Sequence, residues 1–290
     1  MKFVARWASV FMKLQTFTFG LFLSAAIFLF AQHKDPHAAL APQTQMTNWA
    51  AVLDLTHSVS EASPNWEGTE KSPFEARPLG DMKKHGYFTR HISLPEHFST
   101  HIDAPAHFWE GAWTVDQIPT ENLTGPLVVI NVRKQAMKNP DYEVSMDDIA
   151  AWEKANGRIP DGAIVMAATG WDEKWRSMKE YRGADEKGTM HFPGFSLEAV
   201  KFLVEARRVP GIGIDTMGVD YGKSEDYPIH KYTGSKNVYH LENVAGLTTA
   251  PEKGAMIVAA PAKLKGGSGG PVRIFAFIPK TQPPATQSAD

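Results

Sequence analysis

The sequence predicts an α/β domain built on a mixed sheet, and two observations support that prediction. Three continuous apolar runs, Leu127–Val132, Gly162–Ala168 and Val209–Ile214, have the composition of strands that are buried on both faces. Two helices, expected at Ser145–Asn156 and Ser196–Arg208, alternate with these runs, and each begins at a serine that can cap its first turn. Because the expected strands outnumber the helices, we expect one mixed sheet with helices packed on it.

Further strand-like segments flank this central part. Ala51–Leu55 opens the folded region, and Tyr87–Leu94 alternates apolar and polar residues. Met256–Ala260 and Val272–Ile278 are predicted as late strands. The segment between them, Lys263–Gly270, is basic and rich in glycine. We expect a flexible loop there, because a phosphate-binding loop would be followed by a helix.

Composition narrows the class of protein. The chain has 290 residues, a formal net charge of -2 and 43% hydrophobic residues, which are ordinary values for a globular protein with one large or two small domains. With so little net charge there is no electrostatic case for binding nucleic acid. The chain contains no cysteine, which excludes disulfides, thiolate catalysis and zinc sites ligated by cysteine. Any metal must therefore be held by nitrogen and oxygen atoms.

The N-terminus has the features of a secretory signal. Lys2, Arg6 and Lys13 supply positive charge, and the nearly all-apolar run Phe17–Phe30 follows them. We expect residues 1–31 to be a signal peptide; the rival interpretation is an uncleaved membrane anchor. In either case the folded part is expected outside the cytoplasm, periplasmic or secreted after cleavage and membrane-anchored if the segment is retained.

The remainder of the chain divides into three parts. Residues 32–48 are mixed, polar and contain proline, so we expect a disordered leader. Residues 49–280 are expected to form the folded domain, followed by a disordered tail at 281–290. We find no internal repeat that would divide the domain further.

The stretch His97–His107 concentrates groups that can bind a metal or move a proton. Its β-branched residues and its proline favour an extended strand. In a strand, the odd-numbered His97, His101, Asp103 and His107 would share one face. Neutral imidazoles and a carboxylate suit a borderline divalent ion. We therefore interpret the stretch as a metal site, and not as a surface strand with scattered histidines.

Polar residues later in the chain are less informative by spacing alone. His230 and Glu242 could complete a metal shell begun in the histidine-rich stretch, although such pairs also occur by chance. We interpret His240 as a neighbouring structural or supporting group instead of a ligand. Asp215 and Asp220 are interpreted as turn-forming residues without a catalytic role.

The pattern His-x-x-x-His-x-Asp-x-Pro-x-His at residues 97–107 is similar to the signature of the cyclase-like family of metal-dependent hydrolases. That family includes bacterial kynurenine formamidases and isatin hydrolases. The resemblance extends over most of the chain, from Asp54-Leu55-Thr56-His57 to Pro271-Val272-Arg273. It includes His230 and Glu242 at the separation seen in the family. The sequence departs from the family at Ser99, where glycine is usual, and this departure reduces local backbone freedom.

The resemblance implies a compact swivelling α/β fold (cyclase-like), commonly assembled as a homodimer or homotetramer. The metal ligands that it implies are His97, His101, Asp103, His230 and Glu242. His97 and His101 would bind one metal, with Asp103 as a ligand or bridge. His230 and Glu242 would complete a two-zinc site in formamidase-like members, whereas isatin hydrolase-like members are closer to a single manganese site. The cofactor is thus expected to be one or two ions of Zn²⁺ or Mn²⁺. By the same resemblance, His107 would transfer protons and Trp66 would stack on the substrate.

The expected activity is metal-dependent hydrolysis of a non-peptide carbon–nitrogen amide bond in a small aromatic substrate. A hydroxide generated at the metal would attack the carbonyl, and His107 would shuttle a proton to the leaving nitrogen. The substrate would be a cyclic amide such as isatin or an aryl formamide such as N-formylkynurenine, and the expected export favours the cyclic amide slightly. The aromatic residues that suggest a flat substrate are Trp66, Phe108, Trp109, Trp171 and Trp175, although for any single one of them a place in the core is the better expectation.

One alternative from another class stays open, which is an exported metal- or ligand-binding module without catalysis. Such a module would have no need of a spare acid–base group, so the presence of His107 favours an enzyme. A serine hydrolase is disfavoured, because the chain has no Gly-x-Ser-x-Gly motif.

Overall fold

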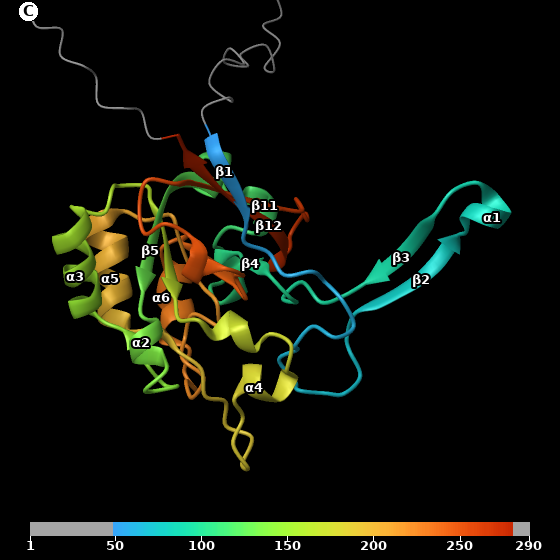
Figure 1. The fold of residues 1–290 in the computed structure, drawn as a ribbon, viewed down its shortest axis with the longest axis horizontal. Coiled ribbons are helices and arrows are strands. Elements are labelled where there is room, and N and C mark those ends of the chain that lie inside the picture. The colour runs from blue at the N-terminus through green and yellow to red at the C-terminus, as the bar shows by residue number, and fades with distance from the viewer. Residues whose placement is uncertain (1–48, 281–290) are drawn as a thin grey trace, which may run out of the picture. The chain divides into compact units, whose positions relative to one another are not determined.

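The computed structural model describes residues 49–280, and Figure 1 shows how strands and helices alternate along them. The predicted signal peptide or anchor at 1–31, the leader at 32–48 and the tail at 281–290 lie outside the described residues. Between residues 49 and 280, no helix combines the length and the apolar character needed to cross a bilayer.

An eight-stranded mixed sheet forms the centre of the domain. In spatial order its strands are β1 (Trp49–Asp54), β12 (Gly269–Pro279), β11 (Met256–Pro261), β5 (Thr124–Asn131), β7 (Ile164–Ala168), β9 (Gly211–Ile214), β10 (Tyr239–Glu242) and β4 (His101–Asp103). Strands β5, β7, β9 and β10 run parallel, and the other neighbours are antiparallel. Because β4 pairs with both β10 and β12, the strands from β12 round to β4 close into a barrel-like ring.

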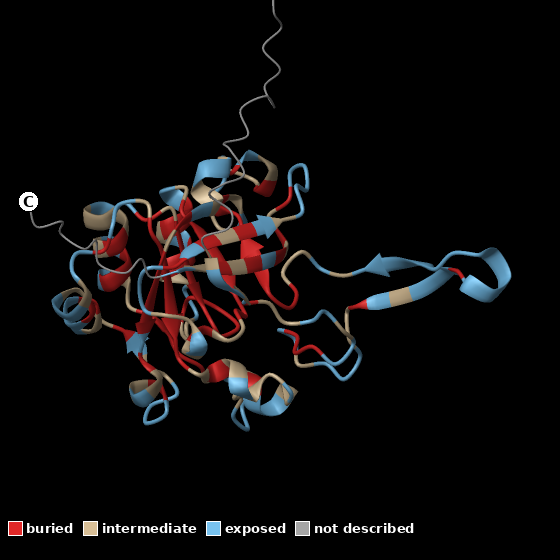
Figure 2. Cartoon of the chain, turned by 45° about the horizontal axis from the view of Figure 1, so that its top comes forward, coloured by how far each residue is buried: buried red, intermediate tan, exposed pale blue. Residues whose placement is uncertain are grey.

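Both faces of the central strands are buried, as their uninterrupted apolar sequence requires. On β5, Leu127 and Val129 pack into one hydrophobic cluster, whereas Val128 and Ile130 pack into another on the opposite face. This alternation follows from the two-residue period of a strand. Figure 2 shows the buried strands enclosed by the rest of the domain.

Helices α3 (Met146–Asn156) and α5 (Leu197–Arg207) cover the outer face of the parallel strands. Each begins where the sequence predicts. The Ser145 side chain accepts a hydrogen bond from the backbone N–H of Asp148, and the Ser196 side chain accepts one from Ala199. These caps satisfy N–H groups that the first turn leaves unpaired.

Shorter elements complete the domain. The other helices are α1 (Met82–His85), α2 (Arg133–Ala136), α4 (Met178–Arg182) and α6 (Pro228–Ser235), with 3-10 helices at Pro105–His107, Val115–Gln117, Thr120–Leu123, Trp171–Lys174 and Leu247–Thr249. Two small sheets join β2 (Glu75–Gly80) to β3 (Thr89–Ser93) and β6 (Glu143–Val144) to β8 (Gly194–Phe195). The β2–β3 hairpin projects from the body of the domain, and all of β3 is exposed (Figures 1 and 2).

Outside the histidine-rich stretch the predicted strands are present, with one difference in pairing. The segment predicted at Tyr87–Leu94 becomes β3, but it pairs with β2 in the projecting hairpin instead of joining the central sheet. The loop Lys263–Gly270 is not flexible at its C-terminal end. The carbonyl of Ser268 accepts a hydrogen bond from the N–H of Ala104, and Gly269 pairs with Asp103 at the start of β12. Sequence composition describes the loop's own residues but not the strand that they contact.

Asp215 is a buried anchor at the end of β9. Its carboxylate accepts hydrogen bonds from the backbone N–H of Thr169 at 3.0 Å and of Gly170 at 2.7 Å, and from the Thr169 hydroxyl. These contacts tie the end of β7 to the end of β9. Asp215 therefore holds a loop between two strands and is not the turn-forming residue that the sequence suggested.

We expect Asp215→Asn to destabilise the domain by about 2 kcal/mol, because an amide N–H₂ would face backbone N–H donors and leave buried groups unpaired. The free energy of unfolding in urea at pH 8 measures this loss. Asp226→Asn is the matched control, because Asp226 is exposed. Equal stability of the two variants would contradict the anchoring role.

Candidate metal centre

The histidine-rich stretch is not one continuous strand. Only His101–Asp103 forms β4, the backbone of Ser99 has a left-handed φ of 59°, and residues from Pro105 to His107 form a 3-10 helix. The predicted alternation is therefore wrong as an explanation of how the side chains converge. The bends on either side of β4 bring them together instead, so that the rings of His97 and His107 stack at 3.9 Å. A left-handed φ is costly for serine, which explains why glycine suits this position.

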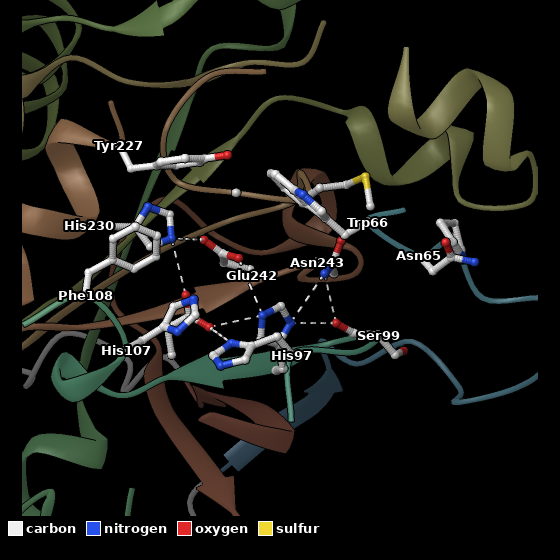
Figure 3. Close-up of a pocket in the computed structure, with 15 residues that line it drawn as sticks. Asn65, Trp66, His97, Ser99, His107, Phe108, Tyr227, His230, Glu242 and Asn243 are labelled. Carbon is white, nitrogen blue, oxygen red and sulfur yellow. Dashed lines mark hydrogen bonds and ion pairs between the residues drawn. The ribbon is translucent and has the colours of Figure 1, made fainter. Parts of the chain in front are cut away.

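The register between β10 and β4 places a second set of side chains beside the first. His240 lies opposite Asp103, and Glu242 lies opposite His101. Directly opposite residues on neighbouring strands have adjacent side chains. His230 reaches the same point from the first turns of α6. The resulting cluster is drawn in Figure 3, apart from His240.

Asp103 is the centre of this cluster. Its Oδ1 lies 2.6 Å from Nδ1 of His97 and 3.1 Å from Nε2 of His101. Its Oδ2 lies 3.3 Å from Nε2 of His230 and 3.8 Å from Nδ1 of His240. Burial disfavours the charged form of Asp103, but the surrounding imidazoles outweigh it and hold its pKa well below the usual value. The carboxylate is therefore ionised and is shared between two pairs of histidines.

Glu242 is a second shared carboxylate. Its Oε1 lies 3.3 Å from Nε2 of His230 and accepts a hydrogen bond from the N–H of Val219. Its Oε2 lies 3.5 Å from Nε2 of His101. Although burial lowers the pKa of His101, Asp103 and Glu242 raise it to about 9. The two carboxylates thus create a buried site that strongly favours positive charge.

Hydrogen bonds behind the histidines fix which ring nitrogen faces the carboxylates. Nδ1 of His101 donates to the carbonyl of Ser99 at 2.9 Å, so Nε2 is the ring nitrogen directed at Asp103 and Glu242. Nδ1 of His230 donates to the carboxylate of Asp220 in the same way. Such outer contacts select the tautomer and orient a ligand imidazole. The interpretation of Asp220 as a turn-forming residue is therefore wrong, because it holds His230.

His97 is oriented from the loop that precedes β12. The Ser268 hydroxyl lies 2.9 Å from Nε2 of His97 and donates its own hydrogen to the carboxylate of Glu96 at 2.7 Å. Since that hydroxyl is already used as a donor, it accepts from Nε2–H, and Nδ1 of His97 is presented to Asp103. Neither Ser268 nor Glu96 was identified from the sequence, because 172 positions separate them.

His107 lines the pocket and lies beside the cluster, at the lower left of Figure 3. Desolvation is the largest effect on this imidazole and lowers its pKa to about 4, against an opposing influence of Asp103. The ring is consequently neutral at pH 7. A neutral imidazole beside the cluster can accept a proton, as a general base must.

A cavity of about 320 Å³ opens onto the cluster. The side chains that line it outside the cluster are those of Pro64, Asn65, Trp66, Ser99, Phe108, Met217, Tyr227 and Asn243. Trp66 is 39% exposed and lies edge-on to Phe192. Of the aromatic residues expected near the site, Trp66 and Phe108 line the cavity. Tyr227 was missed, although it lies three positions before His230.

Three tryptophans expected near the site do not line this cavity. Trp171 is buried in a separate cluster with Tyr181 and Phe192, and Trp109 is half exposed. Trp175 stacks on His57 with the ring centroids 4.0 Å apart. The expectation was wrong for these three residues, because closeness in sequence to a histidine or a loop does not decide which face a side chain takes.

The cluster can hold a divalent metal ion. Its ligand atoms are imidazole nitrogens and carboxylate oxygens, the donor set preferred by zinc and suitable for manganese. Atoms of Asp103, His230, His240 and Glu242 lie within 4.8 Å of one another, and a second group is formed by His97, Asp103 and His107. The five predicted metal ligands thus lie together, four of them buried and His97 partly exposed. The donor chemistry and the fixed tautomers both fit a metal.

The comparisons with known proteins agree with this geometry. Residues 53–221 match the family model Cyclase, described as “Putative cyclase”. The chain belongs to the cyclase family, and the expected family and cyclase-like α/β fold are confirmed.

The relatives are hydrolases. An isatin hydrolase of Roseibium aggregatum is 33% identical over 194 residues, which cover 66% of this chain and 71% of that protein. A kynurenine formamidase of Salinibacter ruber is 24% identical over 77% of this chain and 95% of its own length. The solved isatin hydrolase A from Labrenzia aggregata, bound to benzyl benzoate, has a TM-score of 0.72 at 34% identity and covers 79% of this chain and 94% of its own.

We expect Asp220→Asn to weaken metal binding by roughly 10–100-fold, because the amide could turn its N–H₂ towards His230 and disturb the tautomer that presents Nε2. Calorimetric titration with Zn²⁺ measures the change. Asp147→Asn serves as the control, since Asp147 is an exposed residue in the first turn of α3. An Asp220→Asn protein with the affinity of the unaltered protein would contradict the orienting role.

Proposed function

We propose that this protein is a metal-dependent hydrolase that cleaves a non-peptide carbon–nitrogen amide bond in a small aromatic substrate. The observation that carries the proposal is the cluster of histidines around two shared carboxylates at the base of a 320 Å³ cavity. The identities of the relatives support the same reaction class, because isatin hydrolase and kynurenine formamidase are both named as enzymes that act on aryl amides.

Five residues are proposed to hold the metal, namely His97, His101, Asp103, His230 and Glu242. A Zn²⁺ or Mn²⁺ ion bound there supplies a hydroxide near neutral pH, since such ions lower the pKa of water to about 7, and it supplies positive charge for the carbonyl oxygen. The chain's contribution is to fix these ligands before substrate arrives. Hydrogen bonds from behind fix three of the rings. Ser99 binds His101, Asp220 binds His230 and Ser268 binds His97, in each case at the ring nitrogen that points away from Asp103 and Glu242.

His107 is proposed as the group that moves the proton. It is neutral at pH 7, stacks on His97 and faces the cavity. An amide nitrogen is a poor leaving group until it is protonated, so an imidazole that first accepts a proton and then delivers it to nitrogen assists both steps.

The cavity walls favour a flat substrate. Trp66 lies at the cavity, and Phe108 and Tyr227 lie across from it in Figure 3. Aromatic faces bind flat rings through offset or edge-on contacts. A cyclic amide such as isatin is the first candidate, because the isatin hydrolase relative is more similar than the formamidase. An aryl formamide such as N-formylkynurenine is the second.

Hydrolysis of the two candidate substrates by zinc- and manganese-loaded protein tests the proposal directly. We expect turnover of isatin, followed by absorbance, and loss of turnover when a chelator removes the metal. Preferential turnover of N-formylkynurenine would move the protein to the formamidase class. Failure with both substrates on metal-loaded protein would favour the alternative of a binding module without catalysis.

We expect His107→Ala to keep its metal and to lose turnover by about 10²–10⁴-fold, the usual contribution of a general acid–base group. Asp103→Ala is the matched comparison, and it is expected to lose the metal itself because both halves of the cluster share this carboxylate. Metal content and steady-state rates are measured on both variants. A His107→Ala protein with full activity, or an Asp103→Ala protein with full metal occupancy, would refute the assigned role.

Localisation and assembly belong to the same proposal. Residues 1–31 are proposed to direct export, which places the enzyme in the periplasm or outside the cell, or on the membrane if the segment is retained. Assembly as a homodimer or homotetramer is supported by the projecting β2–β3 hairpin, whose Leu79 and Phe88 are more than half exposed. A two-stranded hairpin with exposed apolar residues gains stability by packing on another surface.

A further inference from the structure

His240 has the environment of a ligand, which the sequence did not indicate. It is only 4% exposed, it lies on β10, and its partner across the strand pair is Asp103. Its ring is nearly perpendicular to that of His230, with the centroids 4.7 Å apart. The His240 ring therefore lies on the same side of Asp103 as His230, next to the Oδ2 atom.

The hydrogen bonds of Thr233 decide the tautomer of His240. The Thr233 hydroxyl lies 2.6 Å from Nε2 of His240 and donates its hydrogen to the carbonyl of Ile229 at 2.7 Å. A hydroxyl has one hydrogen, and a carbonyl can only accept. The Thr233 oxygen must therefore accept from Nε2–H, so in the neutral ring the lone pair is on Nδ1.

That lone pair has no hydrogen-bond partner among residues 49–280. Nδ1 points towards Oδ2 of Asp103 at 3.8 Å, which is too long for a hydrogen bond, and both atoms are acceptors. The void lined by Asp103, His230 and His240 has no room for a water molecule. Burying an acceptor without a hydrogen-bond partner costs free energy, unless a cation lies between Nδ1 and the carboxylate of Asp103.

A cation bound to both atoms removes that cost. Ligand atoms about 2.1 Å from a tetrahedral zinc ion are separated from one another by roughly 3.4 Å. The separations of Oδ2 of Asp103 from His230 and from His240 are 3.3 and 3.8 Å, and Oε1 of Glu242 lies 3.3 Å from His230. These four donors thus have nearly the spacing of one coordination shell.

We infer that His240 is a metal ligand and that it completes a second ion site with His230, Oδ2 of Asp103 and Oε1 of Glu242. The inference rests on the metal site of the proposed function and adds to it a fourth histidine ligand.

Metal stoichiometry of His240→Gln tests the inference. The glutamine amide occupies the place of Nε2 and keeps the bond to Thr233, but it has no atom at the place of Nδ1. We expect the unaltered protein to bind two Zn²⁺ ions and His240→Gln to bind one, with affinity for the second ion reduced by more than about 100-fold. That exceeds the 10–100-fold effect typical of outer contacts.

Two further variants separate a ligand from a supporting residue. Thr233→Val removes the hydroxyl behind Nε2 together with its bond to the carbonyl of Ile229, and it is expected to reduce affinity for the second ion by about 10–100-fold. His57→Gln is the control and is expected to keep both ions, because His57 also has a buried ring nitrogen without a partner but lies outside the cluster. Retention of two ions at unchanged affinity in His240→Gln would overturn the inference.

Zinc-loaded crystals of the unaltered protein give a test that does not depend on a variant folding. Anomalous diffraction should place a zinc peak within bonding distance of Nδ1 of His240. A protein that hydrolyses amides with a single ion, bound away from His240, would overturn the second site and leave the proposed function intact. A protein that binds no metal would overturn both, so the two failures are distinguishable.

Discussion

The carboxylate of Asp103 is the interaction on which the rest of the site depends. Its two oxygens face different pairs of histidines, and it is almost completely buried. A charge can be buried at this depth only when it is surrounded by partners, so the neighbouring elements must supply them. Strand β4 does this by pairing on both sides, with β10 and with β12. Closure of the sheet and assembly of the site are thus one structural event.

Hydrogen bonds to neighbouring residues orient each histidine ring of the cluster. Each of the four clustered histidines has one ring nitrogen bound to a backbone carbonyl, a carboxylate or a hydroxyl, and the other directed at Asp103 or Glu242. These contacts fix the tautomers before any metal binds. The two carboxylates, which these polar neighbours hold close together, create a strong negative potential at the place where a cation would bind.

Two kinds of residue meet at the cavity beside the cluster: one next to the metal-site histidines and others that form the walls. His107, the residue proposed to transfer the proton, stacks on His97 and lines the cavity. Trp66, Phe108 and Tyr227 come from three distant parts of the chain and form the walls. One of these walls also contacts the cluster, because the ring of Phe108 packs on that of His230 with the centroids 4.5 Å apart.

Much of this protein was determined by local sequence. The buried strands of the sheet, the capped helices α3 and α5 and the spacing of His97, His101, Asp103 and His107 are all properties of short segments, because burial and capping leave a pattern within a few residues. The ligand set and Trp66 came from the resemblance to a family. Their meeting at one place is seen only in the folded chain.

Tertiary structure alone decided the rest. The roles of Asp220, Ser268 and His240 depend on hydrogen bonds and strand register between segments that are far apart in the sequence, and no local pattern records them. The same holds for Tyr227 in the cavity wall and for Trp171 and Trp175 away from it. Residue type shows what a side chain can do, whereas the packing of distant elements decides what it faces.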